Sequence, residues 1–460
     1  MRPASPKDIS NDVNKAEGKI LDFLPALSVL CMSLLFVVWP FPHTIAARNI
    51  LIAVGSLSGL FWIFFARHQI RLSGFLPHLF LLGVPCWLII LYLFFPQDSE
   101  FQYKDLTGTW IRITALIFFG FCIGKIFLIH ERYLKYLYIA IVAIPLITPL
   151  AYLWFLHVGP PQPFYAFFYK TKIHGAYYVM YASMVAYALI WLVTSQTMNM
   201  KRRSLHFGAV GYILLIIFYI DFILLDSLNG VIAATLIGLF LLLLLSYRSV
   251  KNLGDLKKSF LIMILLFLIS GAGIYFYKKQ NSTDKLDNLL MDIQMSIDID
   301  ENHNWQRDDA YRLRNIPEPQ DSSGRLINIS TYERVSWFLK SVQIICEYPL
   351  GTGDPYYSFG RYMRAQYPGS VVRQSHSGWL DFAMGAGIPA LLLLWLANGA
   401  VFWRAIKLNK PSLELARIIG ALMLLGMGVM FWHSELADRD FLEEYFFLIA
   451  LFGALLHDNK

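Results

Sequence analysis

Long apolar runs constrain this chain more than any other feature of its sequence. Each run has about 20 residues, the length that an α-helix needs to cross the hydrocarbon core of a bilayer. The chain is 57% hydrophobic and only 15% charged, with a mean hydropathy of +0.50, which lies outside the range of soluble globular proteins. We therefore predict an all-α integral membrane protein with about 12 transmembrane helices. The predicted spans lie near residues 21–40, 46–66, 75–95, 108–128, 134–157, 174–195, 206–225, 229–247, 259–277, 379–403, 413–432 and 440–456.

Lysine and arginine indicate how these spans are oriented. Clusters such as Lys201-Arg202-Arg203 fall between spans of one parity, and cytoplasmic loops carry the positive excess. This predicts an N-in, C-in topology, with one large outer loop between spans 9 and 10. The predicted order is a cytoplasmic tail (1–19), spans 1–9 (20–277), a periplasmic loop domain (278–378), spans 10–12 (379–456) and a cytoplasmic tail (457–460). The first run lacks a small-residue cleavage site, so we expect a retained anchor rather than a signal peptide.

The outer loop contains two segments with helical periodicity. In DKLDNLLMDIQMSID, apolar residues from Leu286 to Ile297 recur on one face, and the other face is acidic. In STYERVSWFLKSVQIICE, Ser330 and Glu333 form the pattern of a capping box. An apolar stripe follows, made of Val335, Phe338, Leu339, Val342 and Ile345. We expect this second helix to lie against the membrane surface or the helix bundle.

Charge and cysteine content exclude other classes. The net charge is +7, but no basic block with interleaved aromatic residues forms a continuous stripe, so a nucleic-acid partner is not expected. The 4 cysteines include no CxxC pair, which indicates neither a disulfide framework nor a zinc site.

Two residues of the loop region could carry chemistry. His376 lies just before the tenth predicted span, where an imidazole could accept the proton of an attacking hydroxyl. Arg334 lies on the capped helix, on a face shared with Trp337 and Ser341, and its guanidinium could hold phosphate oxygens and offset charge on a leaving pyrophosphate. The structural alternatives are a hydrogen-bonded interfacial histidine, and an arginine that is solvated or paired with Glu333.

Further cations break the positive-inside trend. Arg48, Arg112, Lys170 and Lys172 lie at outer helix ends. Arg112 is the sharpest case, about one turn into its helix, where an ionisable group normally faces a bundle interior or a water-filled cavity. We expect Arg112 to contact an anion, whereas the lysines could simply extend to the interface.

The segment 354–373 interleaves tyrosine and arginine. Tyr357 could stack on a sugar, and Arg361, Arg364 and Arg373 would suit phosphorylated glycans or lipid headgroups, although both residue types also anchor proteins at membrane interfaces. A metal-dependent alternative would use outer carboxylates. The candidates for that alternative are Asp98, Glu100, Asp105, Asp221 and Asp226.

Three motifs in order resemble the O-antigen ligase and polymerase superfamily of polytopic membrane glycosyltransferases. They are Glu333-Arg334 with Trp337, then Pro349-Leu350-Gly351-Thr352-Gly353, then His376-Ser377 with Leu380 and Gly387. The large loop between spans 9 and 10 looks like the ligase branch, with a GT-C-like architecture. Two positions depart from the family pattern: Gly385 stands where many members carry Glu, and Asn229 where a second phosphate-binding arginine is expected.

The resemblance implies an O-antigen ligase of the bacterial inner membrane that acts in lipopolysaccharide biosynthesis. Such enzymes transfer a glycan from undecaprenyl pyrophosphate to the lipid A core at the periplasmic face, without metal or cofactor. His376 would assist the acceptor hydroxyl, and Arg334 would bind the pyrophosphate. We assign donor binding also to Arg112, Lys172, Arg48 and Arg373, and glycan binding to Arg361, Arg364, Tyr357 and Trp337. An O-antigen polymerase, a protein O-oligosaccharyltransferase and, in another class, a lipid transporter or flippase remain alternatives.

Overall fold

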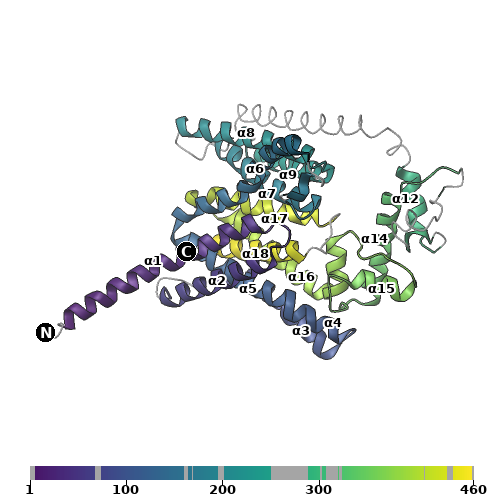
Figure 1. The fold of residues 1–460 in the computed structure, drawn as a ribbon, viewed down its shortest axis with the longest axis horizontal. Helices are drawn as coiled ribbons and strands as arrows, with labels where there is room; N and C mark the ends of the chain where they lie inside the picture. The colour runs from purple at the N-terminus through teal and green to yellow at the C-terminus, as the bar shows by residue number, and fades with distance from the viewer. Residues whose placement is uncertain are drawn as a thin grey trace.

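The computed structural model is almost entirely helical in the residues that it describes, which are 6–67, 74–159, 164–167, 169–194, 201–249, 289–300, 303–306, 320, 324–408, 410–432 and 439–457. A bundle of long helices forms the body, and a smaller group of helices projects from one end of it (Figure 1). The bundle consists of α1 (Pro6–Val38), α2 (Ile45–Phe65), α3 (Leu76–Phe94), α5 (Ile111–Ile129), α6 (Leu134–Val158), α7 (Lys172–Thr194), α8 (Lys201–Leu224), α9 (Leu228–Ser249), α16 (Gly378–Lys407), α17 (Glu414–Met430) and α18 (Arg439–Leu455).

The projecting group is called the loop domain here. It comprises α12 (Leu289–Ile297), α14 (Ile329–Glu347), α15 (Ser358–Gln366) and the segments between them that the structure describes. Its interior is a separate cluster of buried side chains that includes Trp305, Tyr332 and Trp337. This cluster also takes in Leu380 and Met384 of α16, so the loop domain is packed directly onto the start of a bundle helix.

Membrane-crossing length is confirmed for most of the predicted spans. In the described part of the chain, 8 helical segments are long and apolar enough to cross a bilayer; they match predicted spans 1–6, 10 and 11. The seventh and eighth correspond to shorter apolar stretches, Gly208–Leu224 and Gly230–Leu241, and the twelfth to α18. The predicted ninth span, 259–277, lies outside the described residues, so the total of twelve stays a prediction. The chain is thus an all-α, multi-pass membrane protein.

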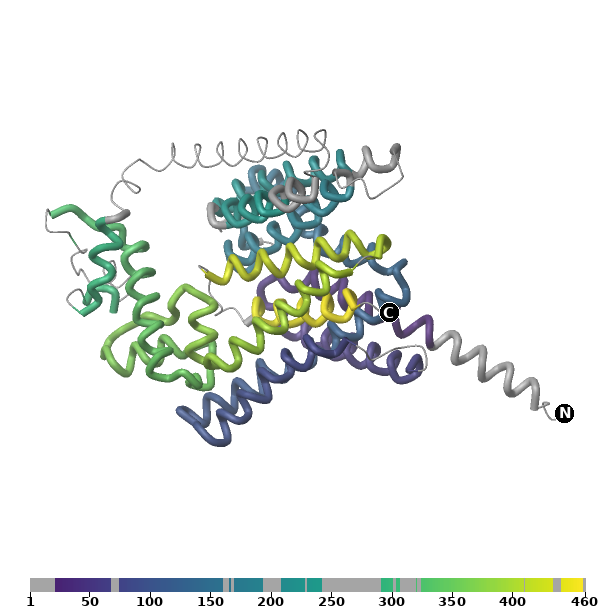
Figure 2. The backbone as a smooth tube through the Cα atoms, turned by 180° about the vertical axis from the view of Figure 1, so that it is seen from behind, coloured from purple at the N-terminus to yellow at the C-terminus, as the bar shows by residue number. Residues whose placement is uncertain are grey.

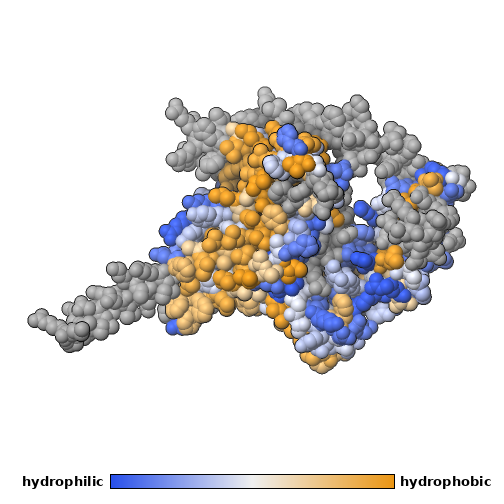
Figure 3. Space-filling view, in the orientation of Figure 1, coloured by the Kyte–Doolittle hydropathy of each residue, from blue (hydrophilic) through white to orange (hydrophobic). Residues whose placement is uncertain are grey.

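Both the contacts between the helices and the outer surface of the bundle suit a bilayer. The last helix, α18, packs along α5, and Gly120 and Gly124 allow this close approach because an added Cβ would lie 2.6 and 2.4 Å from backbone oxygens of α18. Small residues at such contacts let membrane helices approach each other. Large apolar side chains such as Leu57, Phe61 and Leu153 are exposed on the surface, and Figure 3 shows apolar residues spread over the body of the molecule.

One end of the bundle faces the loop domain, and we call it the loop end. Here α3 ends, α16 and α18 begin, and the loop domain is attached (Figure 2). The segment before α5, predicted as a loop, is helical: α4 (Ser99–Asp105) and a π-helical turn (Leu106–Trp110) lead into α5 without a break. Arg112 therefore lies well inside a continuous helical segment, Ser99–Ile129.

One prediction about α14 was wrong. Its N-cap is Asn328, whose side chain accepts a hydrogen bond from the backbone N–H of Thr331, so Ser330 and Glu333 do not form the capping box. The expectation that the helix lies against the membrane surface or the bundle stays a prediction, and the apolar stripe is not the side that packs within the loop domain. The buried residues are Tyr332, Glu333, Ser336, Trp337, Ser341 and Ile344, because the aromatic core of the loop domain and the start of α16 lie on that side.

The acidic face of the other predicted amphipathic helix is also partly buried. In α12, Asp292 is 1% exposed and pairs with Arg325 at 3.0 Å, whereas Met291 and Ile297 are exposed. Leu286 lies outside the described residues.

Candidate functional site

His376 occupies a strained turn immediately before α16. Its φ of 58° is in the left-handed region, which costs a non-glycine residue roughly 1–2 kcal/mol. Asp381, in the first turn of α16, holds the turn: its Oδ1 accepts hydrogen bonds from the backbone N–H of Ser375 at 3.1 Å and from the Ser375 hydroxyl at 2.8 Å. The Ser375 hydroxyl oxygen in turn accepts the backbone N–H of Ser377 at 3.2 Å. Strain of this kind at a polar residue is typical of functional sites.

The imidazole of His376 is also fixed by α14. It stacks on the indole of Trp337, with ring centroids 5.1 Å apart and an interplanar angle of 25°. Trp337 is buried and donates its indole N–H to the carbonyl of Trp305 at 2.7 Å. A half-buried imidazole therefore lies on a platform that the loop domain holds rigid.

Arg334 lies on α14 three residues before Trp337 and is exposed. Residues three apart on a helix are neighbours on one face, with about 5–6 Å between their Cβ atoms. Arg334 and the Trp337–His376 stack thus lie on the same side of α14. Arg334 and His376 thus both lie beside Trp337 on α14. Trp337 itself is buried and stacks on His376, and the glycan-binding role predicted for it stays a prediction.

The motif Pro349–Gly353 closes a break in α16. Gly387 has φ 82° and ψ 168°, which interrupts the helix and leaves carbonyls without their usual donors. The backbone N–H groups of Thr352 and Gly353 donate to the carbonyls of Met384 and Gly385 at 3.0 and 2.7 Å. In return, the N–H of Ile388 donates to the carbonyl of Pro349 at 2.9 Å.

Glycine is required on both sides of this junction. An added Cβ at Gly387 would lie 2.1 Å from the carbonyl oxygen of Leu350, and one at Gly351 would lie 2.4 Å from the nitrogen of Gly387. At Gly385, an added Cβ would lie 2.2 Å from the backbone of Pro355. The motif therefore fixes the end of α14 against α16, and so fixes Trp337 relative to His376.

Arg361 and Tyr357 hold the loop domain to the α3–α4 corner. Arg361 pairs with Asp98 at 3.3 Å and with Asp354 at 3.4 Å, and its guanidinium lies 4.9 Å from the ring centroid of Phe101. Tyr357 packs edge-on against the same ring. The guanidinium of Arg361 is thus engaged by two carboxylates, and the glycan-binding role predicted for it stays a prediction.

Three of the remaining predicted residues have places in the structure. Arg364 and Arg373 are exposed on the loop domain, and Lys172 pairs with Asp226 at 2.8 Å, at the surface.

Burial raises the pKa of Asp354 to about 7, and nearby Asp105 adds to this rise, whereas Arg361 and the N–H groups of Tyr356 and Tyr357 oppose it. The side chain of Asn229 lies outside the described residues.

The carboxylates named for the metal-dependent alternative lie at different places in the structure. Asp98 caps α4, Glu100 pairs with Lys104 at 2.6 Å, and Asp105 accepts the indole N–H of Trp110 at 2.9 Å. Asp221 is fully buried.

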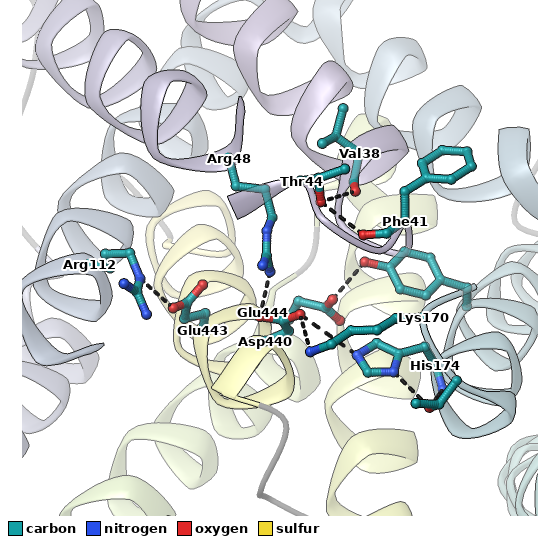
Figure 4. Close-up of polar contacts among 12 residues, drawn as sticks. Val38, Phe41, Thr44, Arg48, Arg112, Lys170, His174, Asp440, Glu443 and Glu444 are labelled. Atoms are coloured by element: carbon teal, nitrogen blue, oxygen red, sulfur yellow. Dashed lines mark hydrogen bonds and ion pairs between the residues drawn. The ribbon is translucent and has the colours of Figure 1, made fainter. Parts of the chain in front are cut away.

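A second polar cluster lies inside the loop end of the bundle, and we call it the α18 acid cluster (Figure 4). Arg48 of α2 pairs with Asp440 of α18, and both side chains are under 10% exposed, at 8% and 7%. Lys170 also reaches Asp440, at 3.3 Å, and the Nε2 of His174 lies 3.8 Å from the same carboxylate. Asp440 thus joins α2, α7 and α18 at one point.

Two further carboxylates complete the cluster. Glu443 accepts a hydrogen bond from Nε of Arg112 at 2.7 Å. Glu444 accepts the hydroxyl groups of Tyr178 and Tyr181 at 2.6 and 3.0 Å. The predicted anion contact of Arg112 is present, but its partner is Glu443. Arg48 and Arg112 thus pair with carboxylates of the chain, and the donor-binding role predicted for them stays a prediction.

Aromatic side chains pack around the start of α18. Trp379, three residues after His376, packs edge-on against Phe431 and Tyr445, with centroids 5.4 and 6.0 Å apart. Phe441 stacks on both Tyr177 and His174, with centroids 4.1 and 4.4 Å away. These contacts link the start of α16 to α18, the helix that carries the acid cluster.

Comparison with known proteins agrees with this arrangement. Residues 212–395 match a family model described as O-antigen ligase. No curated protein matches the chain. The matched range includes α14, the Pro349–Gly353 segment, His376 and the broken first part of α16. Residues 212–395 thus resemble the O-antigen ligase family, and this match supports a place in that superfamily for the part of the chain that carries the candidate site.

Proposed function

We propose that this protein is an O-antigen ligase, which transfers a glycan from undecaprenyl pyrophosphate to the lipid A core oligosaccharide. In this proposal it resides in the bacterial inner membrane, and the loop domain faces the periplasm. The observation that carries the proposal is the His376 imidazole, held in a left-handed turn and stacked on Trp337 one helical turn from the exposed Arg334.

The proposed reaction is a displacement at the anomeric carbon of the donor sugar. A hydroxyl of the acceptor attacks this carbon, a new glycosidic bond forms, and the bond to the pyrophosphate oxygen breaks. His376 accepts or hydrogen-bonds the proton that the hydroxyl loses. The carrier pyrophosphate leaves as an anion, and the guanidinium of Arg334 stabilises its charge by bidentate hydrogen bonds.

The supporting structure fits a rigid site. Asp381 and Trp337 restrict the imidazole, so little reorganisation is needed when the hydroxyl approaches. In this proposal both substrates are lipid-borne, and their reactive groups lie at the membrane surface. His376 immediately precedes a membrane helix, so it lies at the same level.

The test uses purified protein in proteoliposomes with carrier-linked glycan, lipid A core and a chelator. Product is read as the gel mobility of the glycan-bearing core. We expect transfer with the native chain and its loss in His376→Ala. A matched control is His43→Ala, because His43 is also a histidine with positive φ, at 59°, and is exposed between α1 and α2.

Other products would replace the proposal. Donor chains that lengthen on their own carrier would identify a polymerase, and glycan on Ser or Thr of a protein acceptor would identify a protein O-oligosaccharyltransferase. Transfer that needs added metal would move attention to the carboxylates around Asp98 and Asp105. Movement of the carrier lipid without any transfer would favour a transporter.

A further inference from the structure

We propose that the second half of α14 lies in the boundary layer of the bilayer on the loop side, with Phe338 and Val342 in direct contact with lipid chains. This proposal concerns the placement of the loop domain and is independent of the reaction proposed above. It identifies a lipid surface as the partner of an apolar face that no other described part of the chain covers.

The first observation is the exposure of the predicted apolar stripe. Phe338 is 41% exposed and Val342 is 40% exposed, and Leu339 and Ile345 of the same stripe are half-buried. The opposite side of the helix is filled by Trp337, Ser341 and Ile344, which are buried. Exposed apolar surface costs about 25 cal/mol per Å² in water, and that cost disappears when the surface meets hydrocarbon.

The second observation is that α14 is attached to α16 at two points. The Trp337–His376 stack joins the helices just before the start of α16. The hydrogen bonds of Pro349, Thr352 and Gly353 join them again at Met384–Ile388. Along each of the two helices, the two attachment points are about 10–12 residues apart, which corresponds to roughly 15–18 Å. This part of α14 therefore runs beside the first part of α16.

The depth of the second attachment follows from α3. The indole N–H of Trp87 donates to the carbonyl of Ala386 at 2.9 Å, and Trp87 lies seven residues before the last residue of α3. At 1.5 Å per residue this places the junction about 10 Å inside the loop end of a membrane-spanning helix. Interfacial helices bury their apolar face to roughly 5–10 Å, so the end of α14 reaches hydrocarbon depth.

The third observation is continuity with a surface that must face lipid. Leu350, three residues beyond α14, is 41% exposed, and its neighbour across the junction, Ile388 of α16, is 40% exposed. The exposed side of α16 continues through Leu392 and Leu396, at 49% and 52%. The stripe of α14 thus leads through Leu350 onto the membrane-facing side of α16.

Lipid contact along α14 would fix the position of the candidate site along the membrane normal. Arg334 lies at the edge between the apolar stripe and the side that carries Trp337. With Val342 in the acyl region, Arg334 and His376 lie about one to three turns higher, which is the level of lipid phosphates.

The experiment measures which solvent reaches each side of α14. Nitroxide labels are attached at Phe338→Cys and Val342→Cys in full-length protein in which the exposed Cys86 and Cys346 are replaced by serine. The matched control is Gln343→Cys, which is also exposed but lies about 100° around the same helix from Val342, away from the apolar stripe. Collision rates with oxygen, which partitions into bilayers, and with a water-soluble nickel chelate are compared in liposomes, first without substrate and then after undecaprenyl pyrophosphate is added.

We expect oxygen to relax the labels at 338 and 342 more than the nickel chelate does, and the order to reverse at 343. Labels at 338 and 342 that the nickel chelate reaches as freely as at 343 would overturn the proposal. So would labels that neither reagent reaches, since protein would then cover the stripe. Shielding that appears only after undecaprenyl pyrophosphate is added would assign the stripe to the carrier tail and also overturn it. Because no reaction is measured, these outcomes do not depend on the ligase assignment.

Discussion

Asp381 provides the sharpest test of the strained turn that carries His376. In Asp381→Ala, Ser375 loses two hydrogen bonds to a carboxylate, at 3.1 and 2.8 Å. Bonds to charged groups contribute about 1.5–3 kcal/mol each, and they oppose a left-handed penalty of roughly 1–2 kcal/mol at His376. Without them the left-handed penalty is unopposed, and at its upper value of about 2 kcal/mol it lowers the population of the native turn roughly 30-fold.

We therefore expect Asp381→Ala to lower kcat/KM for glycan transfer by roughly 30-fold, with binding of the carrier pyrophosphate unchanged because Arg334 is untouched. Asp381→Asn keeps an Oδ1 acceptor and should recover most of the activity. Transfer is measured in proteoliposomes, and thermal unfolding in detergent monitors folding. Native activity in Asp381→Ala, or an Asn variant as weak as the Ala variant, would refute the positioning role.

Three further predictions concern the parts around the site. Gly387→Ala should lower both the melting temperature and transfer, because the added Cβ would lie 2.1 Å from the carbonyl of Leu350 at a φ of 82°; Gly399→Ala, in the same helix with nothing within 4 Å, should be neutral. Arg48→Gln should destabilise the protein by roughly 3–5 kcal/mol, as expected when one partner of a buried pair is removed, whereas Lys104→Ala, which breaks an exposed pair, should leave thermal unfolding nearly unchanged. In the folded protein the pKa of Asp354 is raised to about 7 from 3.8. Between these pH values the folded state binds a proton that the unfolded state does not, so the stability of the protein should fall as pH rises from about 4 to 7. Asp354→Asn should remove that part of the pH dependence of thermal unfolding, and an unchanged profile would contradict this prediction.

The parts of the fold set by local sequence could be predicted. Apolar run length located the spans, and the order of three short motifs indicated a histidine and an arginine that the structure brings to one side of α14. The pairing of cations could not be predicted, because their partners are far away in the chain. Arg112 and Glu443 are separated by 331 positions, and Arg361 and Asp98 by 263.

The α18 acid cluster was missed, although a signal existed. Asp440, Glu443 and Glu444 stand at the start of an apolar run, and ionisable residues within a membrane span normally face partners inside the bundle. The packed side of α14 could not be predicted for a different reason. Periodicity identifies an apolar face but not the medium that it meets, and in this helix the packed side is the one with Trp337 and Ser341.

The central claim is tested most directly by glycan transfer from undecaprenyl pyrophosphate to lipid A core in proteoliposomes, comparing the native chain with His376→Ala, Arg334→Ala and His43→Ala. The account predicts transfer by the native chain and by His43→Ala, no transfer by His376→Ala with carrier binding intact, and weakened carrier binding in Arg334→Ala. Native rates of transfer in the His376 variant would contradict it.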